Sequence, residues 1–435
     1  MDNRLDPSDE ISQWLNIFAR YHPKSMDMDL SRTHRLMRDL GDPYLKLPPV
    51  IHVAGTNGKG SSLAFMRAML ESVGLKVHVM TSPHLVEFRE RFVVSSAVIS
   101  NDILADYMGR INAMNAGQSA TFFELITAVG FQLFHDFPAD ICLLETGMGG
   151  RLDATNIIPK PLCTLITMIS KDHQQFLGND LTSIAFEKAG IMKEGVPCVI
   201  GSQTDEAWAA GVMKVFEERA QALGVSQYRH NVEWGYEVTN DGFSFDLKGE
   251  ITHCPRPNLL GAHQYANAAA ALVTLKVAGY DITRMQQGIT KALWRGRLQP
   301  LHTGVFQAAL RTGDELWLDG GHNDSAGAVL AAQIAAWRAD DATRDTHLII
   351  GMLKTKNPHE FVAPMRDHLS SITAIAIPDQ DLSFAADDLA SILKSNHAQS
   401  VDEAIRNIVS RAQKPLRILI AGSLYLAGYV LKDNN

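Results

Sequence analysis

Short apolar runs alternate with helical patterns along most of the chain, and this alternation constrains the fold more than any other feature. Runs rich in Val, Ile and Leu suit parallel strands that are buried on both faces by covering helices. The pattern therefore predicts a three-layer α/β fold with a mostly parallel sheet. One stretch, residues 232–251, instead alternates around an Asn-Asp-Gly turn and predicts an antiparallel hairpin. The clearest expected strands are residues 49–55, 76–82, 139–147, 162–169 and 197–201.

The segment LWRGRLQPLHTG predicts a domain boundary, because Gly, Arg and Pro come together there and end a helical pattern. A second series of strands and helices follows and predicts a smaller Rossmann-like C-terminal domain, although no GxGxxG fingerprint opens it. The expected domains are residues 1–297 and 298–435, which meet near Arg297 with the active site between them.

The composition excludes several classes of protein. It is 46% hydrophobic and 20% charged, as in ordinary soluble globular proteins, and the net charge of −8 does not favour a nucleic-acid backbone as partner. No run approaches the roughly 20 apolar residues of a membrane span, and no apolar signal core is found at the start. We therefore expect a cytoplasmic monomer without membrane partners. We expect its four scattered cysteines to be small buried hydrophobes, which are Cys142, Cys163, Cys198 and Cys254.

The sharpest local motif is VIHVAGTNGKGSS, in which an apolar strand enters a glycine-rich turn and a helix follows directly. Glycines let backbone N–H groups converge on phosphate oxygens, the helix N-terminus adds positive charge, and a lysine reaches the terminal phosphates. The spacing departs from the usual Walker pattern, because Gly55 and Gly58 are only three residues apart. A glycine-rich turn with a surface lysine is the alternative to this nucleoside triphosphate site. The expected ligands in the loop are Asn57, Gly58, Lys59, Gly60, Ser61 and Ser62.

A phosphate loop needs Mg²⁺, which takes oxygen ligands and often one or two carboxylates. Glu145 is the candidate carboxylate, since it closes an expected strand at the end where open α/β sheets bind ligands. Ser82 and His173 also follow strand ends, although a capping hydroxyl and a structural histidine explain them as well. Lys188 is either a solvated lysine or a buried lysine near the metal, and local sequence does not decide between the two.

The motifs taken together carry a family resemblance. In chain order they are VAGTNGKGS, TSPHLVEFRERF, TFFE, LETGMGGRLDATN, DHQQFLG, EKAGIMK, LGAHQYANAAAAL, WRGRLQ, LDGGHN and GSLYLAGYV, and HPKSMDMDLSRTHRLMRDLG precedes them. The set resembles the Mur ligase superfamily and, within it, the folylpolyglutamate synthase and dihydrofolate synthase family of bacterial bifunctional type. The implied fold is a P-loop-containing Mur ligase central domain followed by the smaller Rossmann-like domain.

This resemblance implies an ATP-dependent amide ligase that works through an acyl phosphate. It would add L-glutamate to dihydropteroate and to the γ-carboxylate of reduced folates. A monofunctional folylpolyglutamate synthase and another Mur-type amino-acid ligase are the alternatives. Ligases of nucleotide-linked cell-wall precursors carry a further N-terminal domain, for which the roughly 50 residues before the loop leave little room. A P-loop switch is less favoured, because no Asn-Lys-x-Asp base-recognition segment is found.

The resemblance also implies roles for individual residues. Ser82, Glu145 and His173 would coordinate Mg²⁺, of which two ions are expected, and Lys188 would be carbamylated. Lys59, His173 and Lys188 would form the catalytic group. The residues implied to contact ATP outside the loop are Asn267, Arg297 and Asp319. Those implied to line the pterin and folate pocket are Ser25, Met26, Asp27, Thr121, Phe122, Phe123, Glu124, Arg151, Leu152, Asp153 and Ala154, and those toward the incoming glutamate are His322 and Ser423.

Overall fold

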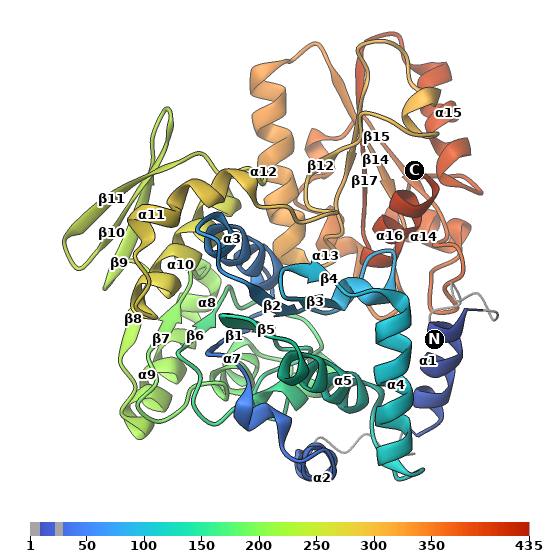
Figure 1. The fold of residues 1–435 in the computed structure, drawn as a ribbon. Helices are drawn as coiled ribbons and strands as arrows, with labels where there is room; N and C mark the ends of the chain where they lie inside the picture. The colour runs from blue at the N-terminus through green and yellow to red at the C-terminus, as the bar shows by residue number, and fades with distance from the viewer. Residues whose placement is uncertain (1–8, 22–28, 435) are drawn as a thin grey trace. The chain divides into compact units, whose positions relative to one another are not determined.

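The computed structural model describes residues 9–21 and 29–434, and these form two compact units. The larger unit comprises the described residues up to Asn258 together with Gln264–Leu293. The smaller comprises Leu259–His263 and the chain from Trp294 onward. Each unit has its own largely parallel sheet with helices packed on it (Figure 1). The expected boundary at residues 297 and 298 stays a prediction.

The larger unit contains a sheet of eight strands. They are β1 (Val50–Ala54), β2 (Val77–Met80), β3 (Phe92–Val94), β4 (Ala97–Val98), β5 (Ile141–Glu145), β6 (Cys163–Ile166), β7 (Cys198–Ile200) and β8 (Gln227–Arg229). Their order is β4-β3-β2-β5-β1-β6-β7-β8, in which only β3 and β4 run antiparallel to their neighbours. The five expected strands are confirmed, and so is the α/β class with its mostly parallel sheet.

Helices cover both faces of this sheet. The longer ones are α1 (Glu10–Arg20), α2 (Ser31–Asp39), α3 (Lys59–Ser72), α4 (Asn101–Asn115), α5 (Phe122–Asp136), α7 (Leu181–Ala189), α9 (Val212–Leu223) and α10 (His263–Val277). The shorter ones are α6 (Gln174–Leu177), α8 (Asp205–Ala209), α11 (Ile282–Met285) and the 3₁₀ turns η1 (Pro43–Lys46), η2 (Phe88–Arg91), η3 (Ala154–Ile157) and η4 (Gln286–Lys291). Alternate residues of a strand face opposite sides. Val50 and Ala54 of β1 accordingly pack toward α5 and α7 on one face, while α3 lies on the other (Figure 1).

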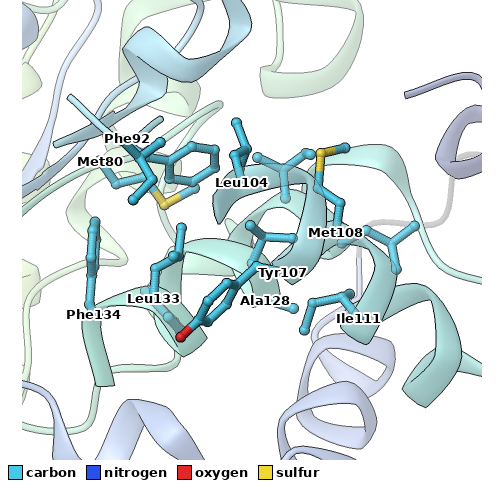
Figure 2. Packing of buried hydrophobic residues seen from close by; sticks show 14 of the residues in the cluster. Met80, Phe92, Leu104, Tyr107, Met108, Ile111, Ala128, Leu133 and Phe134 are labelled. Atoms are coloured by element: carbon cyan, nitrogen blue, oxygen red, sulfur yellow. The ribbon is translucent and has the colours of Figure 1, made fainter. Parts of the chain in front are cut away.

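One core cluster lies where α1, α2, α4 and α5 pack on the sheet. Figure 2 shows its centre, in which Met80 and Phe92 from the strands meet Leu104 and Met108 of α4 and Phe134 of α5. These side chains are at most 1% exposed. Their burial holds α4 and α5 against the sheet, since burying one such side chain contributes about 1.5–3 kcal/mol.

A small antiparallel sheet stands apart from the eight-stranded sheet in the larger unit (Figure 1). Its strands are β9 (Trp234–Val238), β10 (Gly242–Leu247) and β11 (Glu250–Pro255). The hairpin expected over residues 232–251 is confirmed as the β9–β10 pair, with Phe243 opposite Val238. The third strand, β11, was not predicted. It pairs with β10 and follows it after a Lys-Gly turn.

The smaller unit repeats the strand and helix alternation. Its strands are β12 (Gln299–Pro300), β13 (Glu315–Leu318), β14 (Asp345–Ile350), β15 (Ser371–Ala374), β16 (Asn396–His397) and β17 (Leu416–Ala421), in the order β12-β13-β17-β14-β15-β16. Only β12 is antiparallel to its neighbour. The helices are α12 (Asp324–Asp340), α13 (Pro358–Val362), α14 (Ala386–Leu393), α15 (Val401–Arg411) and α16 (Leu424–Asp433), with the short turns η5 (Gln307–Ala309) and η6 (Arg366–His368).

Two expectations from composition can be compared with the described residues. All four cysteines are free and buried, which confirms them as small hydrophobic side chains. In the part of the chain that the structure describes, no helix has both the length and the apolar character of a membrane span.

Candidate active site

The glycine-rich loop between β1 and α3 is held tightly against the segment that follows β6. Gly55 has φ of 148°, and a Cβ atom there would lie 1.8 Å from Oγ1 of Thr167. Gly58 has φ of 91° and is the N-cap of α3. The hydroxyl of Thr56 donates to the carbonyl of Ser170 (3.0 Å) and accepts from its N–H (3.1 Å). Glycine is therefore required where the loop turns and where it approaches its neighbour.

Lys59 begins α3, and its ammonium turns back over the loop. Its Nζ donates to the carbonyls of Gly55 (2.9 Å) and Thr56 (3.3 Å) and lies 3.8 Å from Oε1 of Glu145. The side chain is partly buried. A mobile ammonium at the N-terminus of a helix is the arrangement that binds phosphate groups, because the helix dipole and the amine act on the same anion.

Asn267 of α10, which the resemblance implied to contact ATP, lies against this loop. A Cβ atom on Gly58 would come within 2.5 Å of its Oδ1, and its Nδ2 donates to Oε1 of Gln264 (3.1 Å). The structure thus brings α10 to the start of α3 within the larger unit.

Glu145 ends β5 at the edge of the sheet where β1 enters the glycine-rich loop. Its side chain is nearly buried, and its Oε2 accepts the N–H of Ser82 (3.1 Å), which follows β2. Three of the expected groups, Lys59, Ser82 and Glu145, therefore meet at one place. A nearly buried carboxylate suits Mg²⁺, which prefers oxygen ligands. Among the described residues, no three His, Cys, Asp or Glu side chains are grouped as a metal cluster.

Lys188 of α7 is buried, so it is not the solvated lysine that the sequence left open. Its Nζ donates to the carbonyl of Gly55 (2.9 Å), the same oxygen that Lys59 contacts. Burial, together with the ammonium of Lys59, lowers the pKa of Lys188 to about 7, although the carboxylates of Asp172, Asp153 and Glu145 oppose that shift. A buried lysine with a lowered pKa has a substantial share of free amine near neutral pH.

His173 is less closely tied to this group. It precedes α6 with φ of 50°, its side chain is 45% exposed, and its Nε2 lies 3.8 Å from Oδ2 of Asp172. Asp172 is a charge that the sequence did not single out, although it stands beside the histidine in the DHQQFLG motif and acts on Lys188.

The described residues that are expected to line the acceptor pocket come from two segments. Thr121 caps α5, while Phe122 packs edge-on against Phe88 with ring centroids 6.2 Å apart. The ring of Phe123 covers Gly147, where a Cβ atom would be 2.5 Å from Cζ. These contacts place the start of α5 beside the turn that follows Glu145. The expected residues Ser25, Met26 and Asp27 lie outside the described residues.

The second segment is tied to α7 and to β1. The guanidinium of Arg151 pairs with Glu187 (2.8 Å). Asp153 is buried, accepts from the N–H of Met148 (2.9 Å) and from the hydroxyl of Thr155 (2.5 Å), and burial raises its pKa. Leu152 and Ala154 lie between and beside these anchored residues. Asp153 thus holds the turn in shape.

His52 of β1 is a further buried polar residue of this region that the sequence did not single out. Its Nε2 lies 2.9 Å from Oγ1 of Thr155. Since that hydroxyl donates its proton to Asp153, Nε2 must be the donor. Burial lowers the pKa of His52 to about 3, so the ring is neutral. Its position inside an apolar strand gave no sequence signal of this contact.

In the smaller unit, the expected residues gather at the carboxyl ends of β13 and β17. Asp319 accepts from the N–H groups of Leu298 (2.8 Å) and Gly321 (2.6 Å). His322 Nδ1 lies 3.0 Å from the carbonyl of Gly320. Ser423 caps α16. Because β13 and β17 are parallel, with Leu318 opposite Ile420, their ends lie at the same edge.

Arg297 and His263 also act on or lie near Asp319, and the sequence analysis did not single out His263. Arg297 donates to the carbonyl of Gly296 (3.0 Å). Burial lowers the pKa of His263 to about 4, while the Asp319 carboxylate opposes and the Arg297 guanidinium supports that shift. His263 stands in the LGAHQYANAAAAL motif, so the signal for it was present in the sequence.

Comparisons with known proteins show which family the chain is similar to. The family described as Mur ligase middle domain matches residues 53–275. The dihydrofolate synthase/folylpolyglutamate synthase of Bacillus subtilis is 32% identical over 423 residues, covering 93% of this chain and 94% of that protein. The Escherichia coli protein of the same name is 29% identical over 426 residues, covering 97% of this chain and 95% of that protein.

Solved structures are similar over nearly the whole chain. Escherichia coli FolC in complex with DHPP and ADP matches with a TM-score of 0.86 and 28% identity, covering 98% of this chain and 97% of that one. The bifunctional folylpolyglutamate synthase/dihydrofolate synthase of Yersinia pestis, complexed with AMPPNP and Mn ion, matches with a TM-score of 0.86 and 29% identity, covering 98% of each chain.

The substitution Gly58→Ala tests the loop, and Gly74→Ala is its matched control. Both glycines have positive φ, 91° and 85°, so each substitution costs about 1–2 kcal/mol of backbone strain. Only at Gly58 would the new Cβ meet another group, the side-chain amide of Asn267, since nothing lies within 4 Å at Gly74. We expect Gly58→Ala alone to weaken binding of a nucleoside triphosphate, by about tenfold or more for a displacement costing 1.4 kcal/mol. Titration calorimetry measures this, and equal affinities of the two variants would contradict it.

Proposed function

Because the chain belongs to the dihydrofolate synthase/folylpolyglutamate synthase family of Mur ligases, we propose that it joins L-glutamate to dihydropteroate and to the γ-carboxylate of reduced folates at the expense of ATP. Members of this family are ATP-dependent ligases, and the chain is one. The observation that best supports the proposed site is that Lys59 and Lys188 both donate to the carbonyl of Gly55, while Glu145 lies 3.8 Å from the ammonium of Lys59.

The proposed reaction has two steps. The acceptor carboxylate first attacks the γ-phosphorus of ATP, so that a carboxyl–phosphate bond forms and ADP leaves. The amine of glutamate then attacks the acyl carbon, an amide bond forms, inorganic phosphate leaves and one proton is released. Phosphoryl transfer of this kind depends mainly on positioning and on neutralising negative charge.

The chain's own residues supply that positioning and charge. Lys59 and the loop residues Asn57 to Ser62 would hold the phosphates, while Asn267 borders the loop. Arg297 and Asp319 would contact ATP. The ring faces of Phe122 and Phe123 suit a flat heterocycle, with Thr121, Glu124 and residues 151–154 around them. His322 and Ser423 would face the incoming glutamate.

Mg²⁺ would be held by Glu145, Ser82 and His173, with the carbamate of Lys188 as a further oxygen ligand, and two ions are proposed. When bound, the metal neutralises phosphate charge and orients the acyl group. The related Yersinia pestis structure is described with Mn ion, and the nearly buried carboxylate of Glu145 is an oxygen ligand of the kind that a hard divalent cation prefers.

The proposed activity predicts that continuous ADP release depends on both L-glutamate and the folate acceptor. We expect turnover only when L-glutamate is present together with dihydropteroate or a reduced folate, because the acyl phosphate forms on the acceptor and the amine of glutamate then consumes it. A panel of dihydropteroate and tetrahydrofolate, with product masses recorded, measures this and also separates a bifunctional enzyme from a monofunctional folylpolyglutamate synthase. An equal rate with ATP alone would contradict the proposal.

Glu145→Gln should reduce ligation by about a hundredfold or more while the protein stays folded. The amide keeps an oxygen that can accept from Ser82 but loses the charge that a divalent cation and Lys59 need. Steady-state rates and thermal unfolding measure the two effects. The matched control is Glu71→Gln, which changes a partly exposed ion pair with Arg67 on α3 and should leave both values unchanged. Wild-type rates in Glu145→Gln would refute the metal assignment.

Carbamylation of Lys188 can be tested without turnover. The free amine would attack CO₂, forming a carbamate and releasing one proton, and the amine is available because burial disfavours the ammonium. We expect a carbamate carbon signal by ¹³C NMR of protein equilibrated with ¹³C-bicarbonate. The signal should vanish in Lys188→Arg and persist in Lys193→Arg, whose lysine is also largely buried and donates to the carbonyl of Asn156. A signal that survives Lys188→Arg would exclude this site.

A further inference from the structure

Two arginines of α2 face the segment that leads into α5. Arg35 Nη2 donates to Oδ1 of Asn115 (2.9 Å). Arg32, one turn earlier, makes a closer contact: its Nε lies 3.1 and 3.2 Å from the two oxygens of Glu124, and its Nη2 lies 3.0 Å from Oε1. The side chains of this pair are 17% and 7% exposed. Arg32 therefore contacts the Glu124 carboxylate through more than one N–H group, and both side chains are largely shielded from solvent.

The same carboxylate closes the N-terminus of α5. Oε2 of Glu124 accepts the N–H of Thr121 (2.7 Å), and the hydroxyl of Thr121 accepts the N–H of Glu124 (3.2 Å). This reciprocal capping box fixes the first turn of the helix. Because one carboxylate serves both the cap and the ion pair, the first turn of α5 cannot shift without disturbing a buried charge pair.

That first turn carries the two aromatic rings of the proposed acceptor pocket. Phe122 packs edge-on against Phe88, and Phe123 covers Gly147 so closely that a Cβ atom there would be 2.5 Å away. Gly147 comes two residues after Glu145. The position of the first turn of α5 therefore sets both the ring faces and the turn behind the proposed metal ligand.

Stability alone does not account for the ion pair. Apolar side chains already join the two helices, since Leu36 and Met37 of α2 belong to the same core cluster as Leu125 and Ile126 of α5. Replacing a buried ion pair by apolar groups is often neutral or stabilising, because removing two charges from water costs as much as their attraction returns. What the bidentate pair adds is a fixed direction for the Glu124 carboxylate and the turn that it caps.

We propose that Arg32 is a positioning residue for the pterin-bearing acceptor, acting through Glu124 on the first turn of α5. This inference rests on the proposed function, because the acceptor is the substrate assigned there. Arg32 sets the apparent affinity for the acceptor without contacting ATP or the loop. Arg35 differs from Arg32, because its contacts are with Asp39 of its own helix and with Asn115 and Ser119, which precede α5.

The test compares the Michaelis constants of variants with that of the wild type. In Arg32→Lys the charge remains but the forked contact is lost, so we expect the KM for dihydropteroate to rise about tenfold while the KM for ATP changes less than twofold. Arg35→Lys is the matched control on the same helix and should keep the wild-type KM for both substrates. Thermal unfolding of each variant is recorded in parallel.

A second variant separates positioning from stability. Arg32→Met combined with Glu124→Gln removes both charges, yet a glutamine at this place keeps the capping box. We expect it to unfold close to the wild-type temperature and still show the raised acceptor KM. A wild-type acceptor KM in Arg32→Lys or in the double variant overturns this inference alone, whereas a wild type without acceptor-dependent turnover overturns the proposed function and this inference together.

Discussion

The parallel pairing of β1 with β5 on one side and β6 on the other is the constraint on which the proposed site in the larger unit depends. Val53 lies opposite Glu145 in one neighbour and opposite Leu165 in the other. All three strands therefore end at one edge, where the glycine-rich loop, the Glu145 carboxylate and the segment after β6 meet. The close approach of Gly55 to Thr167 then fixes how deeply the loop lies between its neighbours.

The net charge of the chain does not indicate which charged groups meet at this edge. The net charge is −8, yet Lys59 and Lys188 both donate to the carbonyl of Gly55. Burial of Lys188, together with repulsion from the ammonium of Lys59 that shares this oxygen, lowers the pKa of Lys188 to about 7. Such a site gains by receiving negative charge, whether as phosphate or as a carbamate that converts one amine into an oxygen ligand. The net charge of the chain argued against a polyanionic partner, but it gave no information on how these two amines and the nearby carboxylates are placed.

The sequence was sufficient for the features that depend on neighbouring residues. Apolar runs predicted β1, β2, β5, β6 and β7, and a strand entering glycines before a helix predicted the loop. It failed where a contact joins distant segments or where a helix changes type. Residues 282–293 have a helical sequence pattern but form a short α11 followed by the 3₁₀ turn η4, in which Gly288 lies so close to Met69 that only a glycine fits. Likewise, burial of Lys188 depends on its contact with Gly55, 133 residues away, which no local pattern records.

Glu124 shows the same division within one side chain. Thr-Phe-Phe-Glu is a capping-box pattern, so the sequence contained the local half of its role. The other half comes from Arg32, 92 residues earlier, which no periodicity connects to it. A carboxylate that is shared between a helix cap and a distant arginine transmits the position of α2 to the start of α5. Phe123 in turn lies on Gly147, in the turn that follows Glu145. The position of α2 therefore affects the edge of the sheet where the phosphate loop lies. The acceptor side and the nucleotide side of the proposed site in the larger unit are thus joined by contacts of side chains, and not by the sheet alone.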